Sequence, residues 1–164
     1  MNSAIERLLN LRVGDVMTRS VVQIPAHQTM GAAAQLMIDH EISGAPVVDE
    51  EGRCAGILSG FDFAARERIG CKREEVPRGN AEHVLVCDVP GQPYHIEDFS
   101  EDMVSNHMSS AVQTINPSAA LLQAARIMCA EHIHRLVVLD EHRHPLGIVS
   151  SLDIIAALVK VIGE

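Results

Sequence analysis

The sequence predicts a mixed α+β fold in which two copies of one β-α-β-β-α unit make up most of the chain. The segment Gly56–Asp62 (GILSGFD) recurs 91 residues later as Gly147–Asp153 (GIVSSLD). At this offset, without a gap, 16 of the 54 positions in 13–66 are identical to their partners in 104–157. Self-similarity at a fixed spacing indicates a duplicated structural unit. With 164 residues, 47% of them hydrophobic, the chain has room for two small units that share an aliphatic core.

The elements of the first copy follow from its periodicity. A β-branched run at 21–24 predicts a short strand, and Met30, Ala33 and Met37 then recur at helical spacing. Strands are expected at 45–48 and 54–58, joined by a turn, and a last helix begins after Ser59.

The second copy repeats this order. Its first helix carries the matching apolar positions Leu121, Ala124 and Met128, and Ser118 is placed to cap that helix. The last helix begins after Ser150.

We expect three regions along the chain. Residues 1–68 hold an N-terminal helix and the first unit, 69–102 form an insert, and 103–164 form the second unit. The insert contains six acidic residues between Glu82 and Asp102, with no Lys or Arg among them. A solvated linker is the favoured interpretation, and a loop that docks a partner is the alternative.

Composition narrows the function classes. A formal net charge of −9 opposes binding to phosphate backbones, and an aromatic content of 2% leaves few stacking platforms for bases. We therefore expect no nucleic-acid partner. No signal peptide or membrane span is apparent, and the four cysteines form no C-x-x-C pair, so we expect a cytoplasmic protein.

The repeated motif Gly-x-x-Ser-x-x-Asp has a local interpretation and a functional one. Locally, the serine caps a helix and the aspartate sits in its first turn, where both satisfy free backbone N–H groups. Functionally, a helix N-terminus attracts anions, a serine hydroxyl can bond a phosphate, and a carboxylate can accept ribose hydroxyls. One such motif carries little weight, whereas its duplication favours binding over catalysis.

The runs Asp15–Thr18 and Ser43–Asp49, followed by Gly56–Asp62, resemble a cystathionine-β-synthase (CBS) domain. The second copy resembles it equally, through Ile133–Asp140 and Gly147–Asp153. The resemblance implies a Bateman module, in which two CBS units pack sheet to sheet with pseudo-twofold symmetry. Clefts between such units hold AMP, ADP, ATP or S-adenosylmethionine as regulatory ligands, and no cofactor is obligatory.

The resemblance also implies roles for particular residues. Ser59 and Ser150 would face phosphate, and Asp62 and Asp153 would hold ribose hydroxyls. The purine and the remaining walls would be contacted by Ser20, Val22, Ile42, Ser43, Ile57, Ile133, His134, Arg135 and Ile148. Because Arg135 and Arg19 are the only cations near these positions, a ligand of low charge such as AMP is favoured over ATP.

Two other hypotheses stay open. The clefts can stay empty in a structural or interaction domain, or the pairs His132/His134 and His142/His144, with Cys87, can form a metal or redox sensor. The leading prediction is a regulatory, signal-transducing module and not an enzyme, with an unidentified effector protein. The last helix, apolar nearly all round, predicts a homodimer.

Overall fold

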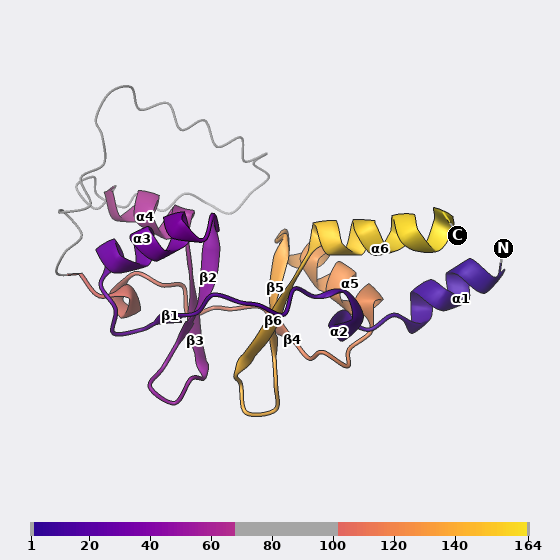
Figure 1. The fold of residues 1–164 in the computed structure, drawn as a ribbon, viewed down its shortest axis with the longest axis horizontal. Coiled ribbons are helices and arrows are strands. Elements are labelled where there is room, and N and C mark those ends of the chain that lie inside the picture. The colour runs from indigo at the N-terminus through magenta and orange to yellow at the C-terminus, as the bar shows by residue number, and fades with distance from the viewer. Residues whose placement is uncertain (1, 68–101, 164) are drawn as a thin grey trace, which may run out of the picture.

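The computed structural model describes residues 2–67 and 102–163, and these form two three-stranded sheets flanked by helices (Figure 1). All of the expected insert except Asp102 lies outside the described residues.

The first unit has the predicted order of elements. In its sheet, β1 runs parallel to β2, and β2 runs antiparallel to β3. Two helices precede this unit and two belong to it. The bounds are α1 (Asn2–Asn10), α2 (Val13–Val16), β1 (Ile24–Pro25), α3 (Met30–Asp39), β2 (Gly44–Val48), β3 (Cys54–Ser59) and α4 (Gly60–Glu67).

The second unit repeats the arrangement, with β4 parallel to β5 and β5 antiparallel to β6. The predicted mixed α+β class and the β-α-β-β-α order are confirmed in both units. The bounds are η3 (Val104–Asn106), β4 (Thr114–Ile115), α5 (Leu121–Glu131), β5 (Arg135–Leu139), β6 (Pro145–Ser150) and α6 (Ser151–Gly163).

Two local predictions were wrong. The strand expected at 21–24 is reduced to Ile24–Pro25, because the residues before it leave the sheet and cross to the other unit. Ser118 does not cap α5: the helix starts after Ala120, and both the backbone N–H and the hydroxyl of Ser118 donate to Asn116 Oδ1, at 2.9 and 2.6 Å. Asn116 thus forms an Asx turn with Ser118 ahead of the helix.

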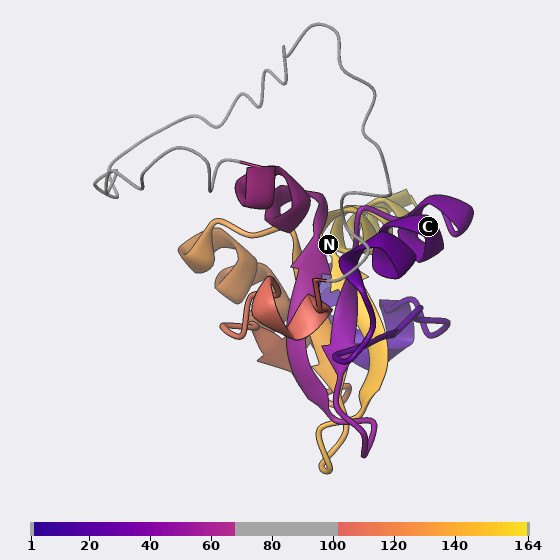
Figure 2. The same cartoon turned by 90° about the vertical axis from the view of Figure 1, so that its left-hand side faces the viewer.

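The sheets of the two units pack face to face, as predicted. Cys54 and Ile57 of β3 meet Val137 and Leu139 of β5 in one apolar cluster. Figure 2, turned by 90°, shows the two sheets one behind the other, with helices around them.

Each unit also lends a segment to the core of the other. Val13 and Met17, which precede the first sheet, are buried with Leu121 and Leu136 of the second unit. Reciprocally, Val104 is buried in the first unit's core. In Figure 1 the indigo chain accordingly passes from α2, beside the second unit, across β6 to reach β1.

Backbone hydrogen bonds fasten both exchanged segments. Thr18 and Ile148 exchange N–H···O bonds of 2.9 and 3.0 Å, and Ser109 and Ile57 do the same. Thus the segment before the first strand of each unit pairs with the last strand of the other.

The repeated glycine of the motif is required by this exchange. A Cβ on Gly147 would lie 2.7 Å from Thr18 O and 2.8 Å from Met17 Sδ. A Cβ on Gly56 would lie 2.6 Å from the sulfur of Met108. The motif therefore begins with glycine because another segment's backbone passes directly over it.

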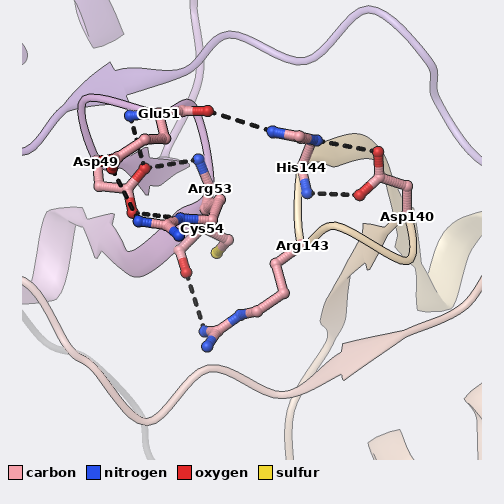
Figure 3. A network of polar contacts seen from close by, with 7 residues as sticks. All are labelled: Asp49, Glu51, Arg53, Cys54, Asp140, Arg143 and His144. Atoms are coloured by element: carbon pink, nitrogen blue, oxygen red, sulfur yellow. Dashed lines mark hydrogen bonds and ion pairs between the residues drawn. The ribbon is translucent and has the colours of Figure 1, made fainter.

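The two β-hairpin tips are joined by a second set of contacts between the units (Figure 3). His144 Nδ1 lies 3.1 Å from Asp140 Oδ2, and its Nε2 lies 3.2 Å from the carbonyl oxygen of Glu51. Cys54 N donates to the carbonyl of Arg143 at 2.9 Å, and Arg143 Nη2 donates back to the carbonyl of Cys54 at 3.1 Å. The backbone N–H of His144 donates to Asp140 and, with the imidazole, holds the pKa of that carboxyl below its ordinary value.

Within residues 2–67 and 102–163, every helix is too short or too polar to cross a membrane.

Replacing Gly147 with alanine tests the close approach of the exchanged segment. Because the new methyl group would meet a backbone oxygen, the chain must shift, and we expect Gly147→Ala to lower the free energy of unfolding by about 1–3 kcal/mol. Urea denaturation measures this loss. Gly60→Ala is the control, since a Cβ there meets nothing within 4 Å and α4 gains a better helix former. Equal urea midpoints for the two variants would contradict the requirement for glycine at position 147.

Candidate functional site

Each Ser-x-x-Asp motif joins the last strand of a unit to its last helix. Ser59 and Ser150 end β3 and β6, and α4 and α6 begin at the next residue. Asp62 Oδ2 accepts hydrogen bonds from the backbone N–H and the hydroxyl of Ser59, at 2.7 and 2.8 Å. Asp153 Oδ2 accepts the same two bonds from Ser150, at 2.7 and 2.6 Å. The local capping arrangement is therefore present in both copies.

This capping leaves part of each carboxylate available. Both bonds go to Oδ2, and Oδ1 of Asp62 and of Asp153 accepts no hydrogen bond from the residues that the structure describes. Each aspartate is half-buried at its helix start. One oxygen holds the helix start while the other can accept hydrogen bonds from a ligand.

A cleft of about 330 Å³ lies in front of the second motif and has walls from both units. The first unit contributes the exchanged segment and the loop before β2. The second unit contributes the start of β5, the end of β6 and the start of α6. The lining residues are Thr18, Ser20, Val21, Val22, Glu41, Ile42, Ser43, Gly44, Arg135, Ile148, Ser150 and Asp153.

Eight of the residues expected from the sequence meet in this cleft: Ser20, Val22, Ile42, Ser43, Arg135, Ile148, Ser150 and Asp153. The sequence predicted these residues, but it could not show which unit's wall residues lie opposite which unit's Ser-x-x-Asp motif. The exchange of segments answers that question, because it carries Ser20 and Val22 of the first unit to β6 of the second.

The other five expected residues lie elsewhere. Ile57, Ser59 and Asp62 are half-buried at the end of β3 and the start of α4. Ile133 is half-buried and His134 is exposed, both just before β5. These positions are related to those of the cleft by the 91-residue repeat, and none of them lines it.

Arg135 is the cation of the cleft. Its Nη1 donates to Ser43 Oγ at 2.9 Å, so the side chain spans from the second unit to the first. It lies directly opposite Ser150 in the pairing of β5 with β6. Residues directly opposite in an antiparallel pair present their side chains on the same face, so the guanidinium and the Ser150 hydroxyl share a surface.

Glu41 is a lining residue that the sequence analysis missed. It follows the C-cap of α3 with a φ of +53°, a left-handed conformation that non-glycine residues adopt at a cost of roughly 1–2 kcal/mol. His132, its partner in the repeat, has the same φ of +53°. Glycine normally signals this conformation, so the sequence held no indication of it.

A larger hollow of about 620 Å³ shares no residue with the cleft. Cys54, Asn116 and Arg143 are among its lining residues, and burial raises the pKa of the Cys54 thiol. No motif in the sequence marked this place.

In the described part of the chain, no group of three or more histidine, cysteine or acidic residues is placed to hold a metal ion. The metal hypothesis therefore has no support from these residues. His144 faces Asp140 and Glu51 in the hairpin contact, and its ring centroid lies 6.2 Å from that of His142. Cys87 lies outside the described residues.

The fold and the cleft define a module of two similar α+β units with a ligand-sized cavity between them. The family model of the CBS domain matches residues 13–67 and 102–160, which together make up most of the chain. The chain therefore belongs to the CBS-domain family, as the motifs predicted.

Known relatives include short and long proteins. The chain is 27% identical over 155 residues to uncharacterized protein MJ1426 of Methanocaldococcus jannaschii, covering 90% of each. It is 28% identical over 130 residues to 5'-AMP-activated protein kinase subunit gamma-3 of Sus scrofa, covering 77% of this chain but only 21% of that one.

Solved structures share the fold. CBSX2 in complex with AMP has a TM-score of 0.68 at 20% identity, covering 93% of this chain and 98% of the other. The CBS domain pair of protein MJ0100, in complex with 5'-methylthioadenosine and S-adenosyl-L-methionine, has a TM-score of 0.63 at 21% identity, covering 89% and 94%.

Proposed function

We propose that this chain is a regulatory module that binds an adenosine nucleotide, AMP-like in charge, in the cleft between its two CBS units. The observation that carries the proposal is the meeting of eight expected residues, from both units, around one cavity of about 330 Å³. That volume falls at the lower end of the range for small-molecule sites.

The chemistry of the walls matches the parts of a nucleotide. The Arg135 guanidinium and the positive N-terminal end of the α6 dipole together suit a phosphate. The free Oδ1 of Asp153 suits a ribose hydroxyl, while Ile42, Ile148 and Val22 offer apolar surface to a purine.

The similar proteins support this ligand class. CBSX2 and the MJ0100 domain pair carry adenosine compounds in structures with this fold, and gamma-3 is a subunit of a kinase named for activation by AMP. We assign the chain a binding role and not a catalytic one, because both motif serines donate their hydroxyls to the aspartate of their own helix cap. Occupancy would then be passed to an effector protein.

Ligand binding to the cleft is tested by thermal unfolding with AMP, ADP, ATP, S-adenosylmethionine and adenosine. A ligand at a hundredfold its dissociation constant stabilises the native state by about 2.7 kcal/mol. For a chain of this length that corresponds to a rise of roughly 5–10 °C in Tm. We expect AMP to produce this rise in the wild type and Asp153→Ala to abolish it, while the lost helix cap costs about 1 kcal/mol of basal stability.

The matched control is Glu6→Ala, which removes an exposed acid from α1, away from the cleft. It should keep the full AMP response. If none of the five compounds shifts Tm at millimolar concentration, the chain is a domain with an empty cleft, and its surface carries its function.

We further propose that the chain forms a homodimer through α6. Four aliphatic residues of this helix are largely exposed, at 73%, 52%, 67% and 75%: Leu152, Ile155, Val159 and Ile162. Their spacing of three, four and three residues is the seam of a two-stranded helical pairing. A second copy supplies the same stripe, so an isologous contact would cover both.

Ile155→Glu is expected to convert the dimer into a monomer, because it places a charge in the middle of the apolar stripe. Light scattering at micromolar concentration should return twice 17.8 kDa for the wild type and 17.8 kDa for the variant. Ile38→Glu is the control, since Ile38 is an exposed isoleucine on α3, outside the stripe. A wild-type mass of one chain would refute the dimer.

A further inference from the structure

The internal repeat supplies a comparison within one chain. If the two units were equivalent, the cleft at Ser150 and Asp153 would have a functional twin at Ser59 and Asp62. The residues placed around the two motifs differ, most of all beside the motif serine.

The largest difference lies beside the motif serine. In the second unit, Ser150 pairs with Arg135 across the strands; in the first, Ser59 pairs with Gly44. Opposite residues of an antiparallel pair share a face, with Cβ atoms about 4.5–5.5 Å apart. A guanidinium therefore shares a face with Ser150, whereas no side chain stands at the corresponding place beside Ser59.

The opposite wall differs as well. The wall facing Ser150 contains the hydroxyls of Ser20 and Ser43, and Ser43 Oγ accepts a hydrogen bond from Arg135. The corresponding positions in the repeat are Ala111 and His134. The Ser43 hydroxyl of the first unit thus holds the Arg135 guanidinium across the cleft, and the repeat has no serine at the corresponding position.

The cation beside the motif serine is the difference that matters for a phosphate. Asp153 and Glu41 line the cleft, so an added phosphate meets two carboxylates there and needs a nearby cation to offset them. Arg135 and the start of the 13-residue helix α6 supply that compensation. At the other motif, Asp62 remains, the opposing arginine is replaced by Gly44, and His132 and His134 stand at the repeat positions of Glu41 and Ser43.

We infer that the module binds one phosphorylated nucleoside per chain, in the Ser150–Asp153 cleft alone, and that Arg135 selects for the phosphate. The inference rests on the proposed function and specifies its stoichiometry and ligand charge. The Ser59–Asp62 motif then serves as the helix cap that its hydrogen bonds already form.

Calorimetric titration with AMP tests the stoichiometry. We expect one AMP per chain for the wild type. Asp153→Ala and Asp62→Ala form a matched pair, since each removes the same capping carboxylate from one unit. Asp153→Ala should lose AMP binding, and Asp62→Ala should retain the wild-type stoichiometry with an affinity changed less than twofold.

Titration with AMP and with adenosine tests the role of Arg135. We expect the wild type to bind AMP at least tenfold more tightly than adenosine. Arg135→Gln should remove this preference by weakening AMP at least tenfold while changing adenosine less than twofold. Arg135→Lys keeps the charge and should retain part of the preference. A purely structural role of Arg135 would weaken both ligands equally, so the ratio separates the two roles, and melting curves without ligand confirm that each variant is folded.

The outcomes distinguish the inference from the proposed function. Two AMP molecules per chain, or loss of AMP binding in Asp62→Ala, would overturn the single-cleft inference while the nucleotide-binding proposal stands. An unchanged AMP-to-adenosine ratio in Arg135→Gln would overturn the role of Arg135. Failure of both AMP and adenosine to bind the wild type would overturn the proposed function itself.

Discussion

The structure depends on one exchange: the segment before the first strand of each unit pairs with the last strand of the other. Two pairs of backbone hydrogen bonds, Thr18 with Ile148 and Ser109 with Ile57, hold it in place. The exchange buries Val13 and Met17 in the second unit's core and Val104 in the first unit's core. It also explains why Gly56 and Gly147 must lack a side chain. Neither unit has a complete core without the other.

The cleft is a consequence of the same exchange. Its first wall is the chain that has just crossed between the units, and its second wall is the end of the strand to which that chain is bonded. A ligand there would contact both units and would be sensitive to their relative position. Helix α6 begins at the cleft with Ser151 and continues into the stripe that we propose as the dimer contact. The proposed ligand site and the proposed partner surface thus lie on one rigid element.

Much of the fold could be predicted because the duplication fixes it. The repeat gave the element order, and the Ser-x-x-Asp spacing located both helix starts. Contacts between the units were not predictable from either copy alone, and so the strand at 21–24 was overestimated where the chain crosses over. The Ser118 cap was wrong because α5 starts two residues later than expected, with Ala120 as its N-cap. Glu41 was missed because its left-handed conformation has no sequence signal.

The central claim is that the nucleotide cleft is composite, formed by the first unit's wall and the second unit's motif. Nuclear Overhauser effects between AMP and isoleucine methyl groups test this most directly, because they report only on short distances. Ile42 and Ile148 lie in different units and both line the cleft. We predict effects from the adenine protons to both residues in the same complex. Effects to Ile57 and Ile133, with none to Ile42 and Ile148, would place the nucleotide at the other motif and contradict the claim.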